Sequence, residues 1–199
     1  MSPARIGVFG GTFDPVHIGH LVAAVNARDA LELDRVLLVV ANVPWQKIGE
    51  RAVSPALDRL AMVEAATRAV DGVEASGIEI QRGGSSYTAD TLADLHVIDP
   101  TAELFVIVGA DVVAGLDTWE RIEAVRDQAT LVVVNRPGSD ASPLLPGLLA
   151  SGWRVVAIEV PALQISSTDL RERAQHGRPL DYLVPEGAIA VIQGRALYA

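Results

Sequence analysis

Two histidines and two glycines stand close together in the stretch GGTFDPVHIGH at residues 10–20. His17 and His20 are three residues apart, so on a helix that begins near residue 16 they share one face. The first turn of a helix carries N–H groups without helical partners and a partial positive charge. Two imidazoles beside those groups can donate hydrogen bonds to phosphate oxygens. The spacing therefore predicts an anion site.

Gly10 and Gly11 directly follow the apolar run RIGVF. Because glycine has no Cβ, the backbone can turn tightly there and approach a ligand closely. The two common phosphate-binding patterns are missing, since the chain has no GxxxxGK[ST] and no GxGxxG with an acidic residue about twenty positions later. Residues 10–20 are therefore expected to bind phosphate by a different arrangement of groups. Asp14 either accepts a hydrogen bond in this arrangement or caps the turn before Pro15.

A second cluster of hydrogen-bond donors lies in ISSTDLRER at residues 165–173. Ser166, Ser167 and Thr168 offer hydroxyl and N–H groups at a predicted helix start. Arg171 follows one turn inside the helix as a planar, fork-shaped donor. Such a serine pair alone usually only caps a helix. Together with the histidine stretch, it is expected to form a second clamp on a triphosphate.

The elements that position these clusters follow from the apolar runs. Short apolar runs alternate with longer amphipathic segments, which predicts an α/β fold with a doubly wound, mostly parallel sheet in a single domain over residues 1–199. In such a sheet, ligands bind beyond the carboxyl ends of the strands. We expect strands at 5–10, 35–41, 103–110, 129–138 and 153–160, and helices at 17–33, 54–70, 88–98, 117–128, 166–177 and 185–193.

Four further expectations concern the rest of the chain. Residues 73–81, VEASGIEIQ, are predicted to form short strands, and the Pro/Gly/Ser-rich stretch from Arg136 to Gly152 is predicted to be a mobile surface loop. Trp153 begins a strand and is expected in the core. His96 and His176 are expected on helix surfaces, without a function.

Charge and composition exclude several classes of protein. A net charge of −9 and a pI near 4.8, with no cluster of Lys or Arg, argue against a general nucleic-acid binder and favour a small nucleotide as ligand. The apolar runs are shorter than the roughly 18 residues of a membrane span, and residues 1–11 do not resemble a signal segment. The absence of cysteine excludes disulfides and thiolate metal sites. We therefore expect a cytoplasmic location.

The histidine stretch resembles the HxGH signature of the nucleotidyltransferase superfamily that shares its fold with class I aminoacyl-tRNA synthetases. ISSTDLRER resembles the second signature of that superfamily. Five ordered motifs are similar to those of bacterial nicotinate-nucleotide adenylyltransferases: GGTFDPVHIGHL, SYTADTL at 86–92, VGAD at 108–111 followed by Trp119, NRPG at 135–138, and ISSTDLRER. The similarity spans nearly the whole chain. One loop departs from the family pattern, because PWQK stands where PPHK is common, with Trp45 and Gln46 replacing a proline and a histidine and Lys47 retained.

This resemblance implies a reaction. AMP passes from ATP to nicotinate mononucleotide, which gives nicotinate adenine dinucleotide and pyrophosphate in NAD biosynthesis. The acceptor phosphate attacks the α-phosphorus in line, without a covalent enzyme intermediate. Mg²⁺ would travel with ATP and bridge its phosphates, with no protein metal cage. The implied partners are ATP and nicotinate mononucleotide, without nucleic acid or membrane, and a homo-oligomer is left open.

The resemblance also implies roles for individual residues. Asp111 would meet a ribose hydroxyl or else cap the next helix, and Trp119 would stack on the pyridine ring or else belong to the core. The implied catalytic residues are His17, His20, Lys47 and Arg171. The implied ATP-binding residues are Gly10, Gly11, Thr12, Phe13, His20, Ser166, Ser167, Thr168 and Arg171, and the implied acceptor-binding residues are Thr88, Gly109, Asp111, Trp119 and Arg136.

Two other functions compete with this one. The first is a sister enzyme, a pantetheine-phosphate or nicotinamide-mononucleotide adenylyltransferase, and SYTADTL with the Trp119 region argues against the former. The second is a nucleotide-binding regulator that keeps the fold without turnover. Such a regulator would be expected to have lost one of the histidines or Arg171, and this chain has all three.

Overall fold

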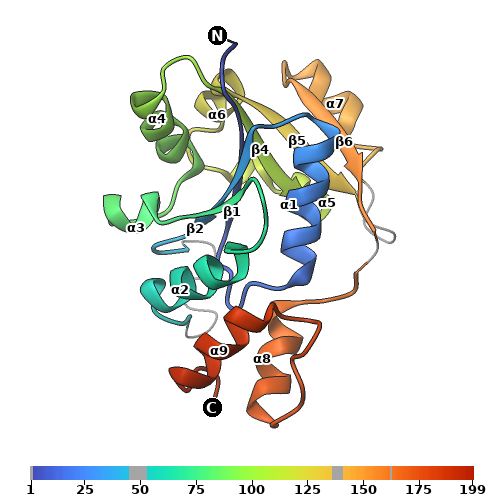
Figure 1. The fold of residues 1–199 in the computed structure, drawn as a ribbon. Coiled ribbons are helices and arrows are strands. Elements are labelled where there is room, and N and C mark those ends of the chain that lie inside the picture. Colours follow the sequence, from blue (N-terminus) through green and yellow to red (C-terminus); the bar gives the residue numbers. More distant parts are fainter. Residues whose placement is uncertain (1, 45–52, 136–140, 162) are drawn as a thin grey trace.

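Six strands form one parallel sheet in the order β3-β2-β1-β4-β5-β6 (Figure 1). The structure is a computed structural model, and it describes residues 2–44, 53–135, 141–161 and 163–199. The order runs outward in both directions from β1, which confirms the doubly wound α/β prediction. The strands are β1 (Arg5–Gly11), β2 (Arg35–Val40), β3 (Val73–Ser76), β4 (Glu103–Gly109), β5 (Ala129–Asn135) and β6 (Val155–Glu159).

The central strands are apolar along their whole length because both faces of the sheet are covered. In β2, Val36, Leu38 and Val40 point to one core cluster, and Leu37 and Val39 point to the other. The first cluster lies under α1, α2, α8 and α9, and the second lies under α4 and α6 (Figure 1). The helices are α1 (Ile18–Ala30), α2 (Ala56–Thr67), α3 (Ile78–Arg82), α4 (Thr88–Ile98), α5 (Ala110–Val113), α6 (Ile122–Gln128), α7 (Leu145–Ala150), α8 (Ser167–Gln175) and α9 (Glu186–Gly194), with a 3₁₀ turn, η2, at Leu116–Thr118.

Two predicted elements are wrong. Residues 78–82 form the helix α3 and not a strand, so Ile78 and Ile80 pack toward opposite core clusters from a single helical turn. The predicted helix over 117–128 is broken into η2 and α6. Trp119 is extended, with ψ 136°, and Arg121 is left-handed, with φ 54°, and the guanidinium of Arg121 reaches across to Asp90 on α4.

Other expectations need smaller changes. The stretch 136–152 is not a loop throughout, because α7 occupies Leu145–Ala150, and residues 136–140 lie outside the described part of the chain. Trp153 is buried, as predicted. His176 is exposed on the C-terminal end of α8, whereas His96 is half-buried, with its ring nitrogens near Gln128 and the carbonyl of Ala102. In the part of the chain that the structure describes, every helix is too short or too polar to cross a membrane.

Candidate active site

The two histidines of the first motif lie together at the start of α1. His17 is the N-cap residue, and the stacked rings of His17 and His20 have centroids 3.7 Å apart. The backbone N–H of His17 donates to Nδ1 of His20 over 3.1 Å, as the residue at this position does in a capping box. Because Nδ1 accepts, the proton of a neutral His20 ring lies on Nε2. His20 therefore presents Nε2 as a donor for an anion.

The second motif docks directly on the first. Ser166 caps α8, where its hydroxyl accepts from the N–H of Asp169. The hydroxyl of Ser167 donates to the carbonyl of Pro15 over 2.9 Å. Arg171 donates from Nη1 to the carbonyl of Asp14 over 2.7 Å and from Nη2 to the hydroxyl of Thr168 over 3.1 Å. The predicted pairing of the two clusters is thus a direct contact, which uses part of the Arg171 fork.

Asp14 is a buried acceptor within the first motif, in the turn between β1 and α1. Its side chain is 2 % exposed, accepts from the hydroxyl of Tyr198 over 2.7 Å and is 3.4 Å from the N–H of Ser54. Burial, followed by the hydrogen bond to Asp14, raises the pKa of Tyr198 far above its ordinary value. Tyr198 therefore stays a protonated donor at any working pH. Of the two roles left open for Asp14, the structure favours hydrogen bonding.

Arg59 on α2 is a functional candidate that the sequence reasoning missed. Its side chain is 1 % exposed, and three of its nitrogens reach carbonyls in three segments. Nε donates to Ser54 over 2.8 Å, Nη1 to Thr12 over 2.9 Å, and Nη2 to Asn42 over 3.1 Å. Thr12 follows β1 and Asn42 follows β2. One buried guanidinium thus joins the carboxyl ends of two neighbouring strands to the start of the α2 segment.

A pocket of about 210 Å³ opens at the carboxyl ends of β1 and β4. These two strands flank the point where the strand order reverses, which is where ligands bind in doubly wound sheets. Predicted ATP-binding and acceptor-binding residues meet in this pocket. They are Gly10, Gly11, Thr12, Thr88, Gly109 and Trp119.

Gly11 and Phe13 show why the turn after β1 has its sequence. A Cβ on Gly11 would lie 2.7 Å from the ring of Phe13, so only glycine fits there. Phe13 is buried, adopts φ 49° and packs edge-on against His20 with centroids 4.9 Å apart. Phe9 contacts both rings and lines the pocket. The histidines therefore lie directly behind the pocket wall.

An ion pair joins two segments that line the pocket. Arg121 donates from both terminal nitrogens to the two carboxylate oxygens of Asp90, each over 2.7 Å. Its guanidinium also lies 5.8 Å from the centre of the Tyr87 ring. The hydrogen bond from Arg121 holds the pKa of Asp90 below its usual range. The start of α4 and the segment that carries Trp119 are thereby fixed to each other.

Some predicted residues lie elsewhere. Asp111 is exposed on α5 and does not line the pocket. Trp119 does not begin a helix, because it ends η2 with its N–H bonded to the carbonyl of Leu116. Trp119 is half-buried against the core and also lines the pocket, so the core contact is confirmed and the stacking on a pyridine ring stays a prediction. Lys47, Arg136 and the neighbouring Trp45 and Gln46 lie outside the described residues.

Comparisons with known proteins agree with this geometry. Residues 8–173 match the model of the cytidylyltransferase-like family. The chain is 48% identical over 194 residues to a protein of Corynebacterium kroppenstedtii named as a nicotinate-nucleotide adenylyltransferase, covering 98% of this chain and 90% of the relative. A relative of the same name from Leifsonia xyli is 46% identical over 197 residues, covering 99% of this chain and 95% of the relative.

The fold also matches a solved structure. The nicotinic acid mononucleotide adenylyltransferase of Plasmodium falciparum, complexed with NaAD, superposes with a TM-score of 0.77 at 15% identity and covers 98% of this chain and 97% of its own. At that identity the likeness concerns the fold alone. The sequence relatives, which match over almost their full length, carry the assignment further. The chain belongs to the nicotinate-nucleotide adenylyltransferase family of nucleotidyltransferases.

Proposed function

We propose that this enzyme transfers AMP from ATP to nicotinate mononucleotide, forming nicotinate adenine dinucleotide and pyrophosphate. The observation that supports the proposal is the direct contact between the two motifs, together with the packing of His20 against Phe9 of a pocket that Thr88 and Trp119 also line. The names of the full-length relatives support the same substrates. The catalytic unit would comprise residues 1–199, and the metabolites it uses favour the cytoplasm.

The phosphates of ATP would lie along the start of α1. A Cβ at Gly10 would meet no protein atom within 4 Å, so the packing of the protein does not explain why glycine stands there. A ligand that approaches the backbone closely would explain it. His17 and the Nε2 of His20 would donate to the phosphates, with His20 nearest the α-phosphate, where charge develops. Ser167, Thr168 and Arg171 at the start of α8, together with Lys47, would hold the departing pyrophosphate. Two polyanions must be held in line, so the residues would act by positioning and charge stabilisation.

The acceptor would lie on the other side of the pocket. Its pyridine ring would stack on Trp119, and its carboxylate would accept from the Thr88 hydroxyl and the N–H groups at the start of α4. Gly109 would allow close approach of the ring to the end of β4. Asp111 and Arg136 would contact the ribose and phosphate beyond the pocket.

Enzymes that use ATP in this way generally need a divalent cation, and we propose Mg²⁺ bound to the phosphates of ATP. Within residues 2–44, 53–135, 141–161 and 163–199, no three His, Asp or Glu side chains come together as a metal site. The donors around the phosphate region are imidazole, hydroxyl and guanidinium groups, which suit phosphate oxygens and not a hard cation. The ion would neutralise phosphate charge while the side chains orient the nucleotide.

Pyrophosphate release with ATP and a panel of acceptor mononucleotides tests the proposal. We expect kcat/KM for nicotinate mononucleotide to exceed that for the nicotinamide form at least tenfold, about 1.4 kcal/mol, because the amide donates where only acceptors fit. Trp119→Ala should raise the KM for the acceptor and leave that for ATP nearly unchanged. Equal use of both mononucleotides, or a Trp119→Ala defect confined to ATP, would contradict the assignment.

A further inference from the structure

The pocket wall contains a buried carboxylate without an assigned role. Glu79, in the first turn of α3, is 6 % exposed and lines the pocket together with Thr91 of α4. The Thr91 hydroxyl, itself 1 % exposed, donates to Oε1 of Glu79 over 2.6 Å. Among the described residues, none donates a hydrogen bond to Oε2. Glu79 thus brings a largely uncompensated negative charge to the pocket.

Arg82 on the same helix forms no ion pair with this carboxylate. Arg82 lies one turn further along the chain, and its Nη1 is bonded to Asp94 over 2.6 Å. Its Nη2 donates a long hydrogen bond, over 3.4 Å, to the Thr91 hydroxyl. The described residues that line the pocket include a second carboxylate, Glu120, and apolar side chains, but no lysine, arginine or histidine. A buried charge is costly unless it is paired, so this pocket is suited to a ligand that brings positive charge.

The proposed acceptor brings such a charge, and the inference rests on the proposed function at this point. A pyridine whose ring nitrogen is bonded to ribose is a quaternary pyridinium and is positive at every pH. The ring of nicotinate mononucleotide is therefore zwitterionic, with a positive ring and a negative carboxylate. Thr88 and the start of α4 suit the negative end, and the face of Trp119 attracts a cation. Among the described residues that line the pocket, Glu79 and Glu120 are the two carboxylates that can supply opposite charge, and of these Glu79 is the buried one.

We propose that Glu79 is a specificity-determining residue that recognises the positive charge of the acceptor's pyridinium ring. Thr91 fixes the orientation of the carboxylate through Oε1, and no described residue donates to Oε2. The pocket then selects a ring by charge as well as by shape. A ring of the same outline without the positive charge should bind less well.

The experiment compares two acceptors that differ in ring charge. Chemical reduction of nicotinate mononucleotide gives the 1,4-dihydropyridine, whose ring is neutral and of similar size. Glu79→Gln keeps the shape and an acceptor for Thr91 but removes the charge. We expect this variant to lower affinity and kcat/KM for the oxidised acceptor about tenfold, equivalent to about 1.4 kcal/mol, through KM. The values for the reduced acceptor and the KM for ATP should not change. Glu74→Gln, at an exposed position on β3, is the matched control for net charge.

Calorimetric titration of both acceptors without ATP separates this inference from the proposed function. If the wild type binds the oxidised acceptor but releases no pyrophosphate, the proposed function fails. The ratio of the affinities for the oxidised and the reduced acceptor still tests the role of Glu79 in that case. An equal loss for both acceptors in Glu79→Gln would overturn recognition of ring charge and point to a ribose contact or a structural role. An unchanged ratio of oxidised to reduced affinity, or no binding of either form to the wild type, would overturn it as well.

Discussion

Replacing Arg59 by methionine should destabilise the protein and impair ATP use together. The change keeps a long side chain in the same buried space but removes the donors to the carbonyls of Ser54, Thr12 and Asn42. A net loss of about 1 kcal/mol for each hydrogen bond gives a decrease of about 3 kcal/mol in the free energy of unfolding. For a chain of this size, that corresponds to a fall in Tm of roughly 6–12 °C.

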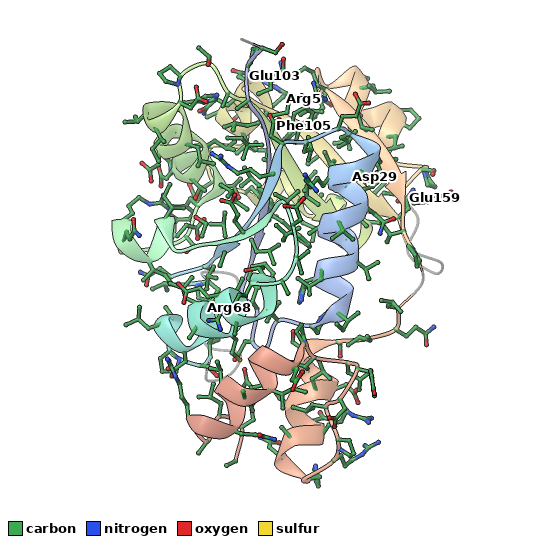
Figure 2. All side chains as sticks on the ribbon, in the orientation of Figure 1. Arg5, Asp29, Arg68, Glu103, Phe105 and Glu159 are labelled. Atoms are coloured by element: carbon green, nitrogen blue, oxygen red, sulfur yellow. The ribbon has the colours of Figure 1, made fainter. Side chains whose placement is uncertain are left out.

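The assay is thermal unfolding alongside steady-state kinetics well below the transition. Because Arg59 anchors Thr12 behind the phosphate region, kcat/KM for ATP should fall at least tenfold in the folded variant. Arg59→Lys keeps the charge but loses the planar, fork-shaped donor. Its Tm and its kcat/KM for ATP should therefore lie between those of the methionine variant and the wild type. Arg68→Met, at the exposed C-terminal end of the same helix (Figure 2), is the control that should change neither quantity. A methionine variant that melts within 2 °C of the wild type, on the scale of ordinary surface changes, would refute the reasoning.

Three further predictions concern the motif residues. His20→Ala should lower kcat about 10²–10³-fold, the scale for one transition-state donor, and His20→Gln, which can still cap α1, should recover stability without recovering kcat. Near-normal kcat in His20→Ala would contradict this role. Arg171→Lys should weaken ATP use and leave the acceptor KM unchanged, because the planar fork spans Asp14 and Thr168; unchanged ATP kinetics would exclude the second clamp. Since the pKa of Tyr198 is raised above 10.0, the folded phenol stays protonated when the unfolded one ionises, so stability is lost as the pH rises above about 10. Tyr198→Phe should lose less stability between pH 8 and pH 10.5 in urea titrations, and an identical pH dependence would contradict the linkage.

Local patterns predicted the strands and most helices because both are determined by short-range rules. The strand β2 is apolar at every buried position, and α8 begins at a serine cap. Both elements can therefore be predicted without knowing which distant residues they contact. The break at Trp119 could not be predicted in this way, since it accompanies tertiary contacts, among them an ion pair between Arg121 and a residue 31 positions away. Propensity favours a continuous helix there, and tertiary contact overrides it.

The same distinction separates the site residues. The histidines and Gly11 stand out by type and spacing, and the structure brings them together behind the pocket. Glu79 and Arg59 carry no motif, because an isolated charged residue in an amphipathic helix looks like a solvated one. A signal for Arg59 did exist, since it precedes Met62 and Val63 at helical spacing and therefore lies on the buried face of α2. Tyr198 could not be found, because its partner Asp14 is 184 positions earlier.

The contacts of Asp14 also impose an order on assembly during synthesis. The turn between β1 and α1 that holds Asp14 leaves the ribosome before its partners Arg171 and Tyr198, which follow Asp14 by 157 and 184 residues. At about 5–20 residues per second, the turn waits roughly 10–30 s for these two partners. During that interval the nascent chain can pair its central strands, while the carbonyl of Asp14 lacks Arg171 and its carboxylate lacks Tyr198. The nucleotide site therefore becomes complete only as the C-terminal helices dock, which ties the onset of activity to the end of folding.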